Sequence, residues 1–446
     1  MSFTITDSTQ FRIKDIAIIT KGSPQPIDIT SLYEELNIFD SLFLPVISGN
    51  ILITDSLGLS DKLAFDGSEV LAINIEKSSD EEIASFKKSF RIYKQTDRRN
   101  INQTSERYIL NFVSDEFFFS DQQRVTQSYE TSYSSVVDKI LTNYLKVEQA
   151  NRGLLESTSG IKKIVIPNLK PLDAIDWCAK RSTDSKNSPN YLFFRNNLGF
   201  NFASLSTLLK KESILSINFQ PKNLSFKDAL SEISSARSFE ILVQNDIIDK
   251  TRSGVNAGTF IGFDPITRTF GEKQISFGDV YDSMDHGNKT PNVTEIFNKD
   301  NTSSLTTNDS RKVLSIFGQT RKNSNYIKSR DPHSISKVEN QEKFAFQRRA
   351  ILKNLMAKRM KIVMPGNFQL TSGFNVDFVS PGFGLKGKGD ESNDESISGK
   401  HLIIATRNII TNNKHETVIE VATDSSNVPS SKVSSPKQRQ VLETYR

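Results

Sequence analysis

The side chains best suited to recognise a ligand lie in YLFFRNNLGFNFASL, residues 191–205. Gly199 comes directly before Phe200, and Phe202 follows two residues later, a spacing that partly matches the RNA-recognition-motif strand whose aromatic rings stack on bases. Three positions depart from that motif, namely Leu198, Asn201 and Leu205. No companion four-stranded pattern surrounds the segment, so base stacking is the less favoured interpretation.

The same aromatic residues suit the core of a folded domain. Phe193 and Phe194 precede an Asn-Asn-Leu-Gly turn, which indicates a hairpin whose two strands are both apolar. Trp177 lies one element earlier and can pack against Phe200 and Phe202. We therefore expect the hairpin to hold a domain together. The residues that we expect to mark the core are Pro171, Trp177, Phe193, Phe194, Gly199, Phe200, Phe202, Pro365 and Gly366.

Two segments near the C-terminus have the spacing of ligand-binding loops. GFGLKG, residues 382–387, has the glycine spacing of a dinucleotide-binding turn, but the charged residues 388–391 follow it where an apolar helix is required. A hairpin tip is the favoured alternative.

The second segment has the first three ligand spacings of a calcium loop, at Asp390, Ser392 and Asp394. Glu395 stands where that loop needs glycine, and His401 stands where it needs a bidentate glutamate. We expect no calcium site here.

The remaining chemistry-bearing residues form no catalytic motif. His286, His333, His401 and His415 have no metal-binding spacing, and neither G-x-S-x-G nor H-E-x-x-H occurs. The single cysteine, Cys178, excludes an internal disulfide and a cysteine-rich zinc site. We expect no enzymatic activity, no cofactor and no metal.

One predicted helix, near residues 341–361, is strongly basic. Its cations are Lys343, Arg348, Arg349, Lys353, Lys358, Arg359 and Lys361, opposed only by Glu342. Such a helix could contact an acidic partner surface or passing DNA. The alternative, which we favour, is a solvated face on a helix whose apolar stripe packs on a sheet.

The composition indicates a globular protein of several domains. The chain has 446 residues, 36% of them apolar, and a net charge of +5, which is too small for general nucleic-acid binding. The N-terminus lacks the pattern of an export signal, and no apolar stretch is long enough for a membrane anchor.

The N-terminal third reads as strands around one short helix. We expect Thr30 to cap a helix through Leu32, Leu36 and Phe39. Strands are indicated by alternation at Leu71, Ile73, Ile75, Phe90, Ile92, Tyr108, Leu110 and Phe112. The polar stretch from Lys94 to Arg107 suits the tip of a long hairpin.

Further along, helices and strands alternate. Ser134 or Ser135 is expected to cap a helix that continues to Leu145, and Pro171 to begin the next one. Strands are expected at Ile214–Phe219, Gly258–Asp264, around a turn at Pro365-Gly366, and over KHLIIATRNII and ETVIEVAT; helices are expected from Ser225 and from Phe344 to Met356.

Taken in order, several blocks resemble the central baseplate hub proteins of contractile phage tails, the family of the phage T4 baseplate hub. They are LYEELNIFDSLFLPVISGNILITDS at 32–56, FRIYKQTDRR with RYILNFVSDEFF, SSVVDKIL at 134–141, IPNLKPLDAIDWCAKRS running into the aromatic hairpin, and MPGNFQLTSGFNVDFVSPG with GKHLIIATRNII. The resemblance covers roughly residues 27–424.

The resemblance implies a strand-rich α+β fold with two tail-tube-like β-barrel domains and two additional α/β segments. The expected divisions are a first barrel at 1–117, a connecting α/β domain at 118–212, a second barrel at 213–250 with 341–424, an inserted surface domain at 251–340, and a flexible C-terminal tail at 425–446. The polar insertion at 285–340 and the acidic loop at 388–398 depart most from the family.

The resemblance also implies a non-enzymatic role in the virion, in the tail baseplate, after synthesis in the host cytoplasm. Three copies would form a pseudo-hexameric ring that adapts a hexameric tail tube to a trimeric central spike. Baseplate wedge proteins could join them, and DNA would pass through the channel without specific binding. Two alternatives stay open: a tail-associated peptidoglycan hydrolase and a nucleic-acid-binding module.

Overall fold

The computed structural model describes residues 11–21, 25–63, 65–76, 85–186, 188–219, 234–255, 257–264, 269–276, 284–291, 311–316, 345–382 and 393–428. Fourteen of its strands belong to one hydrogen-bonded sheet that runs through two curved halves. The expectation of a strand-rich α+β fold is confirmed. We call residues 11–113 the N-terminal unit, residues 114–212 the connecting unit, and the second half of the large sheet the C-terminal unit.

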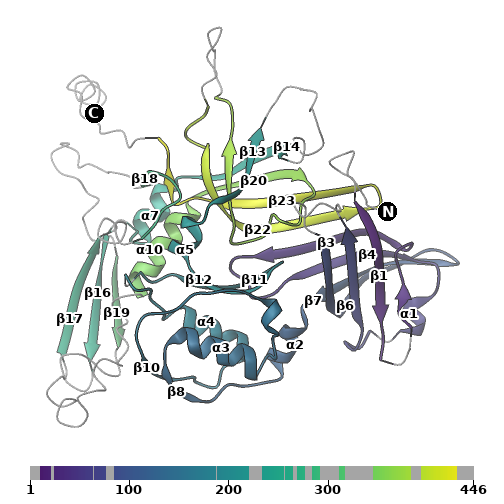
Figure 1. The fold of residues 1–446 in the computed structure, drawn as a ribbon, viewed down its shortest axis with the longest axis horizontal. Coiled ribbons are helices and arrows are strands. Elements are labelled where there is room, and N and C mark those ends of the chain that lie inside the picture. The colour runs from purple at the N-terminus through teal and green to yellow at the C-terminus, as the bar shows by residue number, and fades with distance from the viewer. Residues whose placement is uncertain are drawn as a thin grey trace, which may run out of the picture.

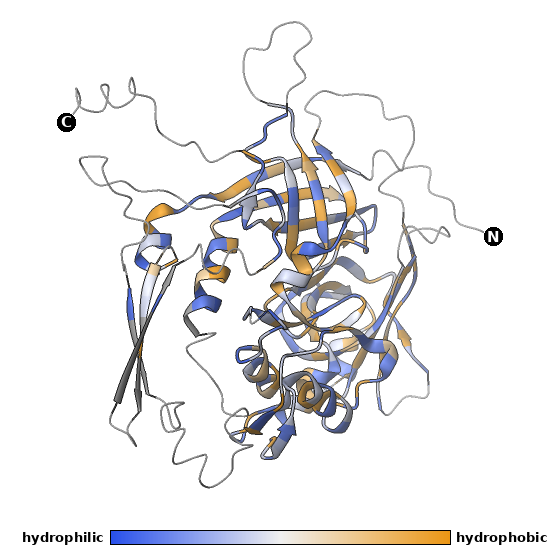
Figure 2. Cartoon of the chain, turned by 60° about the vertical axis from the view of Figure 1, so that its left-hand side comes forward, coloured by the Kyte–Doolittle hydropathy of each residue, from blue (hydrophilic) through white to orange (hydrophobic). Residues whose placement is uncertain are grey.

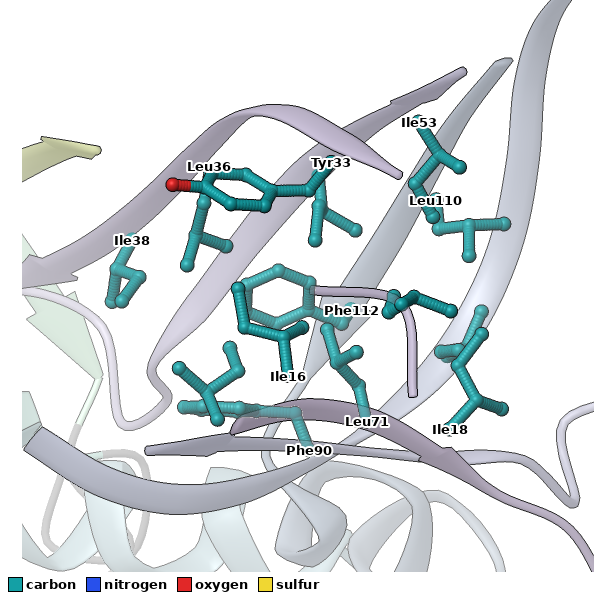
Figure 3. Packing of buried hydrophobic residues seen from close by; sticks show 14 of the residues in the cluster. Ile16, Ile18, Tyr33, Leu36, Ile38, Ile53, Leu71, Phe90, Leu110 and Phe112 are labelled. Atoms are coloured by element: carbon teal, nitrogen blue, oxygen red, sulfur yellow. The ribbon is translucent and has the colours of Figure 1, made fainter. Parts of the chain in front are cut away.

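The N-terminal unit contains strands in the order β3-β4-β7-β6-β5-β1-β2. They are β1 (Arg12–Ile19), β2 (Ile27–Asp28), β3 (Tyr33–Ser41), β4 (Ser48–Asp55), β5 (Val70–Glu76), β6 (Phe86–Asn102) and β7 (Ser105–Val113), with the short helix α1 (Leu59–Lys62) after β4. Apolar side chains alternate with polar ones, so one face of every long strand points into a common interior, as Figure 3 shows.

The two ends of this strand order, β3 and β2, are consecutive in the chain. β2 leads into β3 through residues 29–32, and within this link the Ile29 amide donates to the Ile16 carbonyl of β1 at 2.9 Å. The Ile16 amide in turn donates to Thr30 Oγ1 at 3.0 Å. Both bonds tie the link between β2 and β3 to β1.

The expected strands at residues 71–75, 90–92 and 108–112 are confirmed, and so is the long hairpin of β6 and β7. The expected helix after Thr30 is wrong, because this segment forms β3. The pairing of β3 with β4 shifts between Tyr33 and Glu35, which interrupts the two-residue alternation. The shift leaves Tyr33 and Leu36, three residues apart, both in the core, so this stretch lacks the regular alternation of a strand.

The connecting unit is built from helices on small sheets. Its elements are α2 (Asp115–Asp121), β8 (Ser128–Thr131), α3 (Tyr133–Asn143), a 3₁₀ turn (Gln149–Asn151), β9 (Arg152–Leu155), β10 (Lys162–Val165), α4 (Pro171–Ala179), β11 (Tyr191–Asn196), β12 (Gly199–Ser204) and α5 (Leu205–Lys210). Pro171 begins α4 as expected. The cap of α3 is Ser132, whose side chain accepts from the Ser135 amide, so neither Ser134 nor Ser135 is the cap.

In the C-terminal unit, too, the two ends of the strand order are consecutive in the chain. Its strands are β13 (Ser213–Phe219), β14 (Ser235–Ala236), β15 (Ser238–Gln244), β20 (Lys358–Pro365), β21 (Asn375–Val379), β22 (Gly399–Thr411) and β23 (Lys414–Ala422). The pairing runs β14-β13-β21-β22-β23-β20-β15, and only Arg237 separates β14 from β15. Along these strands Figure 2 shows apolar and polar residues alternating.

The expected strands on both sides of Pro365-Gly366 exist, but they do not form a hairpin. β20 pairs with β15 and β23, whereas β21 pairs with β13 and β22. Residues 366–374 therefore form a loop that crosses from one side of the unit to the other. We call this segment the junction loop.

The described part of the insertion forms a separate sheet of β16 (Ala257–Asp264), β17 (Thr269–Ser276) and β19 (Lys312–Ile316), which stands apart at the left of Figure 1. β18 (Thr290–Pro291) pairs with β24 (Ser425–Ser426). Two helices, α7 (Ile247–Arg252) and α10 (Ala345–Met356), complete the described elements. The helix expected from Ser225 and most of the expected C-terminal tail lie outside the described residues.

A continuous ladder joins the two halves of the large sheet. β3 pairs with β22 from Ser41 opposite Ala405 to Glu35 opposite Thr411, while its other edge pairs with β4. Segments more than 360 residues apart in the sequence thus share one backbone hydrogen-bond network.

Candidate functional site

The junction loop is the place where all three units meet. Phe368, in this loop, is buried in the core of the N-terminal unit, and its ring lies 5.1 Å from the ring of Phe86 on β6. Leu370, two residues later, is buried in the core of the C-terminal unit. One loop therefore contributes apolar side chains to two cores, and separating the units would expose both.

The polar residues of the loop converge on one carboxylate of β3. Asp40 Oδ2 accepts hydrogen bonds from Thr371 Oγ1 at 2.8 Å and from Thr406 Oγ1 of β22 at 2.7 Å. Its Oδ1 accepts from the Ser372 amide at 2.9 Å. Asp40 is only 5% exposed. Burial raises the pKa of this carboxyl, while the hydrogen bonds from Thr406, Ser372 and Thr371 act in the opposite direction.

The turn of the aromatic hairpin is hydrogen-bonded to the same loop. Asn196 Nδ2 donates to the Ser372 carbonyl and Asn197 Nδ2 to the Phe368 carbonyl, each at 2.9 Å. The Asn197 amide donates to Thr371 Oγ1 at 3.2 Å. The turn that could have carried a ligand thus binds backbone of the C-terminal unit.

The two faces of the hairpin pack into different cores. Phe193, Phe200 and Phe202 lie in the core of the connecting unit, and Phe194 lies in a second cluster shared with α5, α10 and β22. All residues of β11 and β12 are buried, which leaves no aromatic face on which a base could stack. This placement fits the packing interpretation of the hairpin.

The other expected core residues also occupy tight positions. Pro171 is buried, and Trp177, half-buried, packs edge-on against Tyr133. Gly199 has a φ of +131°, and a Cβ there would meet the Asn151 carbonyl oxygen at 2.3 Å. Gly366 follows the buried Pro365, and a Cβ on it would meet the His415 ring at 2.0 Å.

Most of the expected basic residues have partners within the chain. Arg348 Nη1 donates to the Tyr191 carbonyl at 2.6 Å, so this side chain ties α10 to the hairpin. Lys353 pairs with Asp249 at 2.9 Å. Arg349 is the exposed arginine of α10, and Lys343 lies outside the described residues.

The helix is also shorter than the basic stretch. α10 ends at Met356, so Lys358 and Arg359 lie on β20 and not on the expected helix. Lys358 is buried, its ammonium donates to the Ser396 carbonyl, and burial lowers its pKa to about 8. Arg359 pairs with Glu420 at 2.9 Å. The basic sequence pattern thus divides between two elements, because a strand boundary falls inside it.

The described residues contain no group of three or more His, Cys, Asp or Glu side chains that could hold a metal ion. Most of the GFGLKG segment and two of the calcium-loop candidates, Asp390 and Ser392, lie outside the described residues. Within the described part of the chain, no helix is both long and apolar enough to cross a bilayer.

One histidine is buried without a full set of hydrogen bonds. His401 is 1% exposed, its Nδ1 lies 2.8 Å from the Gly399 carbonyl oxygen, and its Nε2 has no hydrogen-bond partner in the described structure. Burial lowers the pKa of His401 to about 4, with the nearby Lys358 adding to the effect.

Sequence reasoning missed the polar centre of the junction. Asp40 and Thr406 are ordinary polar residues within apolar strands, and only their position opposite the junction loop reveals their role. The one available signal was a carboxylate at an inward position of an alternating strand.

Several solved structures are similar to this chain over most of its length. The 43 kDa tail protein of prophage MuSo2 from Shewanella oneidensis matches 93% of this chain and 99% of its own with a TM-score of 0.50 and 8% identity. A tail protein from Neisseria meningitidis matches 92% of this chain and 96% of its own with a TM-score of 0.48 and 12% identity. A type VI secretion component from E. coli matches 93% of this chain and 76% of its own with a TM-score of 0.41 and 8% identity.

No protein-family model and no curated protein sequence matches the chain. The identity to the prophage protein is 8%, so the comparison shows a shared fold. The shared fold with a prophage tail protein agrees with the sequence resemblance to a phage tail family. The chain has the fold of a phage tail protein.

The hydrogen bonds of Asp40 predict unequal effects for two substitutions. Asp40→Ala should lower the free energy of unfolding by about 2–4 kcal/mol, because the buried Ser372 amide loses its acceptor. Asp40→Asn keeps an oxygen for that amide and should cost about 1 kcal/mol. Urea unfolding measures both, and equal losses for the two variants would contradict the assigned role of the carboxylate.

The buried His401 predicts a loss of stability in mild acid. Its pKa is about 4 in the folded chain against a reference of 6.5, so the unfolded chain binds more protons between these values. The free energy of unfolding should fall by up to about 3 kcal/mol as the pH falls through this window. His401→Gln, which cannot titrate there, should lack this component in urea unfolding at pH 7 and pH 4.5. An unchanged pH dependence in the variant would refute the assignment.

Proposed function

We propose that this chain is a structural hub subunit of a phage tail baseplate, and that it acts without catalysis or a cofactor. The observation that carries the proposal is the pair of curved sheet units within one chain. In each unit the two ends of the strand order are consecutive in the chain, and the ladder of β3 with β22 joins the units edge to edge.

The geometry suits an adapter between two symmetries. If each unit is a barrel of the tail-tube kind, three chains in a ring present six barrels to a hexameric tube. The same ring offers three identical faces to a trimeric central spike. Closed rings of identical subunits are the usual solution for such homo-oligomers. The fold shared with the prophage tail protein supports this proposal.

A virion location follows from the proposed role, with synthesis in the host cytoplasm and assembly at the baseplate. DNA would pass through the ring without specific recognition. The local contacts of Arg348, Lys353 and Arg359 support that part of the proposal, because these cations are already engaged within the chain.

The test is the solution mass of the purified chain by light scattering, alone and mixed with the trimeric spike protein of the same virion. We expect a trimer, or a monomer that becomes a trimer when the spike is added. The spike alone supplies the control mass. A chain that stays monomeric in the presence of the spike would contradict the proposal.

A further inference from the structure

A groove of about 560 Å³ lies where the three units meet. Three phenylalanines line it: Phe374 of the junction loop is half-buried, whereas Phe86 and Phe368 are almost fully buried. Leu198, in the turn of the aromatic hairpin, and Ile214, on β13, stand at its mouth, 61% and 40% exposed. Such uncovered apolar side chains around a concave surface mark a docking site rather than scattered surface residues.

The groove carries positive charge on one side. Lys87 and Lys88 line it from β6, and no Asp or Glu is among the described residues that line it. The backbone of Lys88 pairs with Ile73 of β5, but its ammonium makes no hydrogen bond or ion pair among the described residues. The charges that act on it are those of Arg195 and Glu116, which form an ion pair with each other.

This environment disfavours the charged form of the Lys88 side chain. Burial and the charge of Arg195 lower its pKa to about 8, and Glu116 offsets only part of the effect. A half-buried ammonium without a partner is an uncommon arrangement, since desolvated charges in proteins are generally paired. An incoming carboxylate would supply the missing partner.

The polar groups beside the apolar floor fit a peptide backbone. Both donors of Asn197 described above are used by the junction loop, while its Oδ1 accepts no hydrogen bond from the described residues and could accept one from a peptide N–H. Gln369 lines the same groove and offers an amide with both a donor and an acceptor. A free anion would leave the apolar floor uncovered.

We propose that this groove binds a segment of a partner protein in which an aliphatic or aromatic side chain lies next to a carboxylate. The apolar side chain rests on Phe374 between Leu198 and Ile214. The carboxylate pairs with Lys88. Binding at this point would brace all three units at once, and it requires only the monomer, so it stands apart from the ring.

The experiment is isothermal titration calorimetry of the full chain with the acetylated, amidated peptide Asp-Leu-Phe-Asp. We expect saturable binding that Lys88→Gln weakens about tenfold, the usual effect of losing one charge-assisted contact. Leu198→Asn should also weaken it, whereas Lys94→Gln, an exposed lysine further along β6, should not. The peptide Asn-Leu-Phe-Asn should bind about tenfold more weakly than the acidic peptide.

Four results would overturn the proposal, three of them from direct binding. These three are no saturable binding of the acidic peptide up to about 1 mM, equal affinity for Lys88→Gln and the unmodified chain, and equal affinity for the two peptides. Inorganic phosphate, which has charge without an apolar group, should not compete. Full competition by phosphate would show an anion site and contradict the role of the apolar floor. A failed ring would leave these titrations unaffected, so the two proposals can fail separately.

Discussion

The fold depends on one short loop that belongs to three units at once. Phe368 packs in the N-terminal core and Leu370 in the C-terminal core, and the hairpin turn of the connecting unit donates hydrogen bonds to the carbonyls of Phe368 and Ser372. Each unit alone would leave part of this loop unpaired or exposed to water. The buried carboxylate of Asp40 fixes the register, because its hydrogen bonds are satisfied only when β3, β22 and the junction loop are all in place.

The proposed ring would require a rigid monomer. In that ring the two sheet units would take the places of two neighbouring subunits of a hexamer, which requires a constant angle between them that a flexible linker would not provide. The ladder of β3 with β22 fixes the units along their edges, and the junction loop fixes them across their ends. The hairpin turn at Asn196 and Asn197 then attaches the connecting unit to the junction loop, which packs in the cores of both sheet units.

The sequence predicted the local structure well wherever one pattern dominated. The alternation of apolar and polar residues predicted β5, β6 and β7, and the aromatic residues on both sides of Gly199 predicted the buried hairpin. It failed where a local irregularity changed the pattern, as at the bulge in β3, or where an element ended inside a uniform composition, as between Met356 and Lys358. The groove and the Asp40 network could not be predicted, because their members lie hundreds of residues apart and only the tertiary contacts bring them together.

The most direct test of this coupling is urea unfolding followed by two probes on the same sample. The single tryptophan, Trp177, reports on the connecting unit through its contacts with Tyr133 and Arg181. Far-UV circular dichroism reports mainly on the large sheet. If the junction loop couples the three units, both signals change in one transition with the same midpoint. Separate transitions for Trp177 and for the sheet would show units that unfold independently and would contradict the rigid monomer.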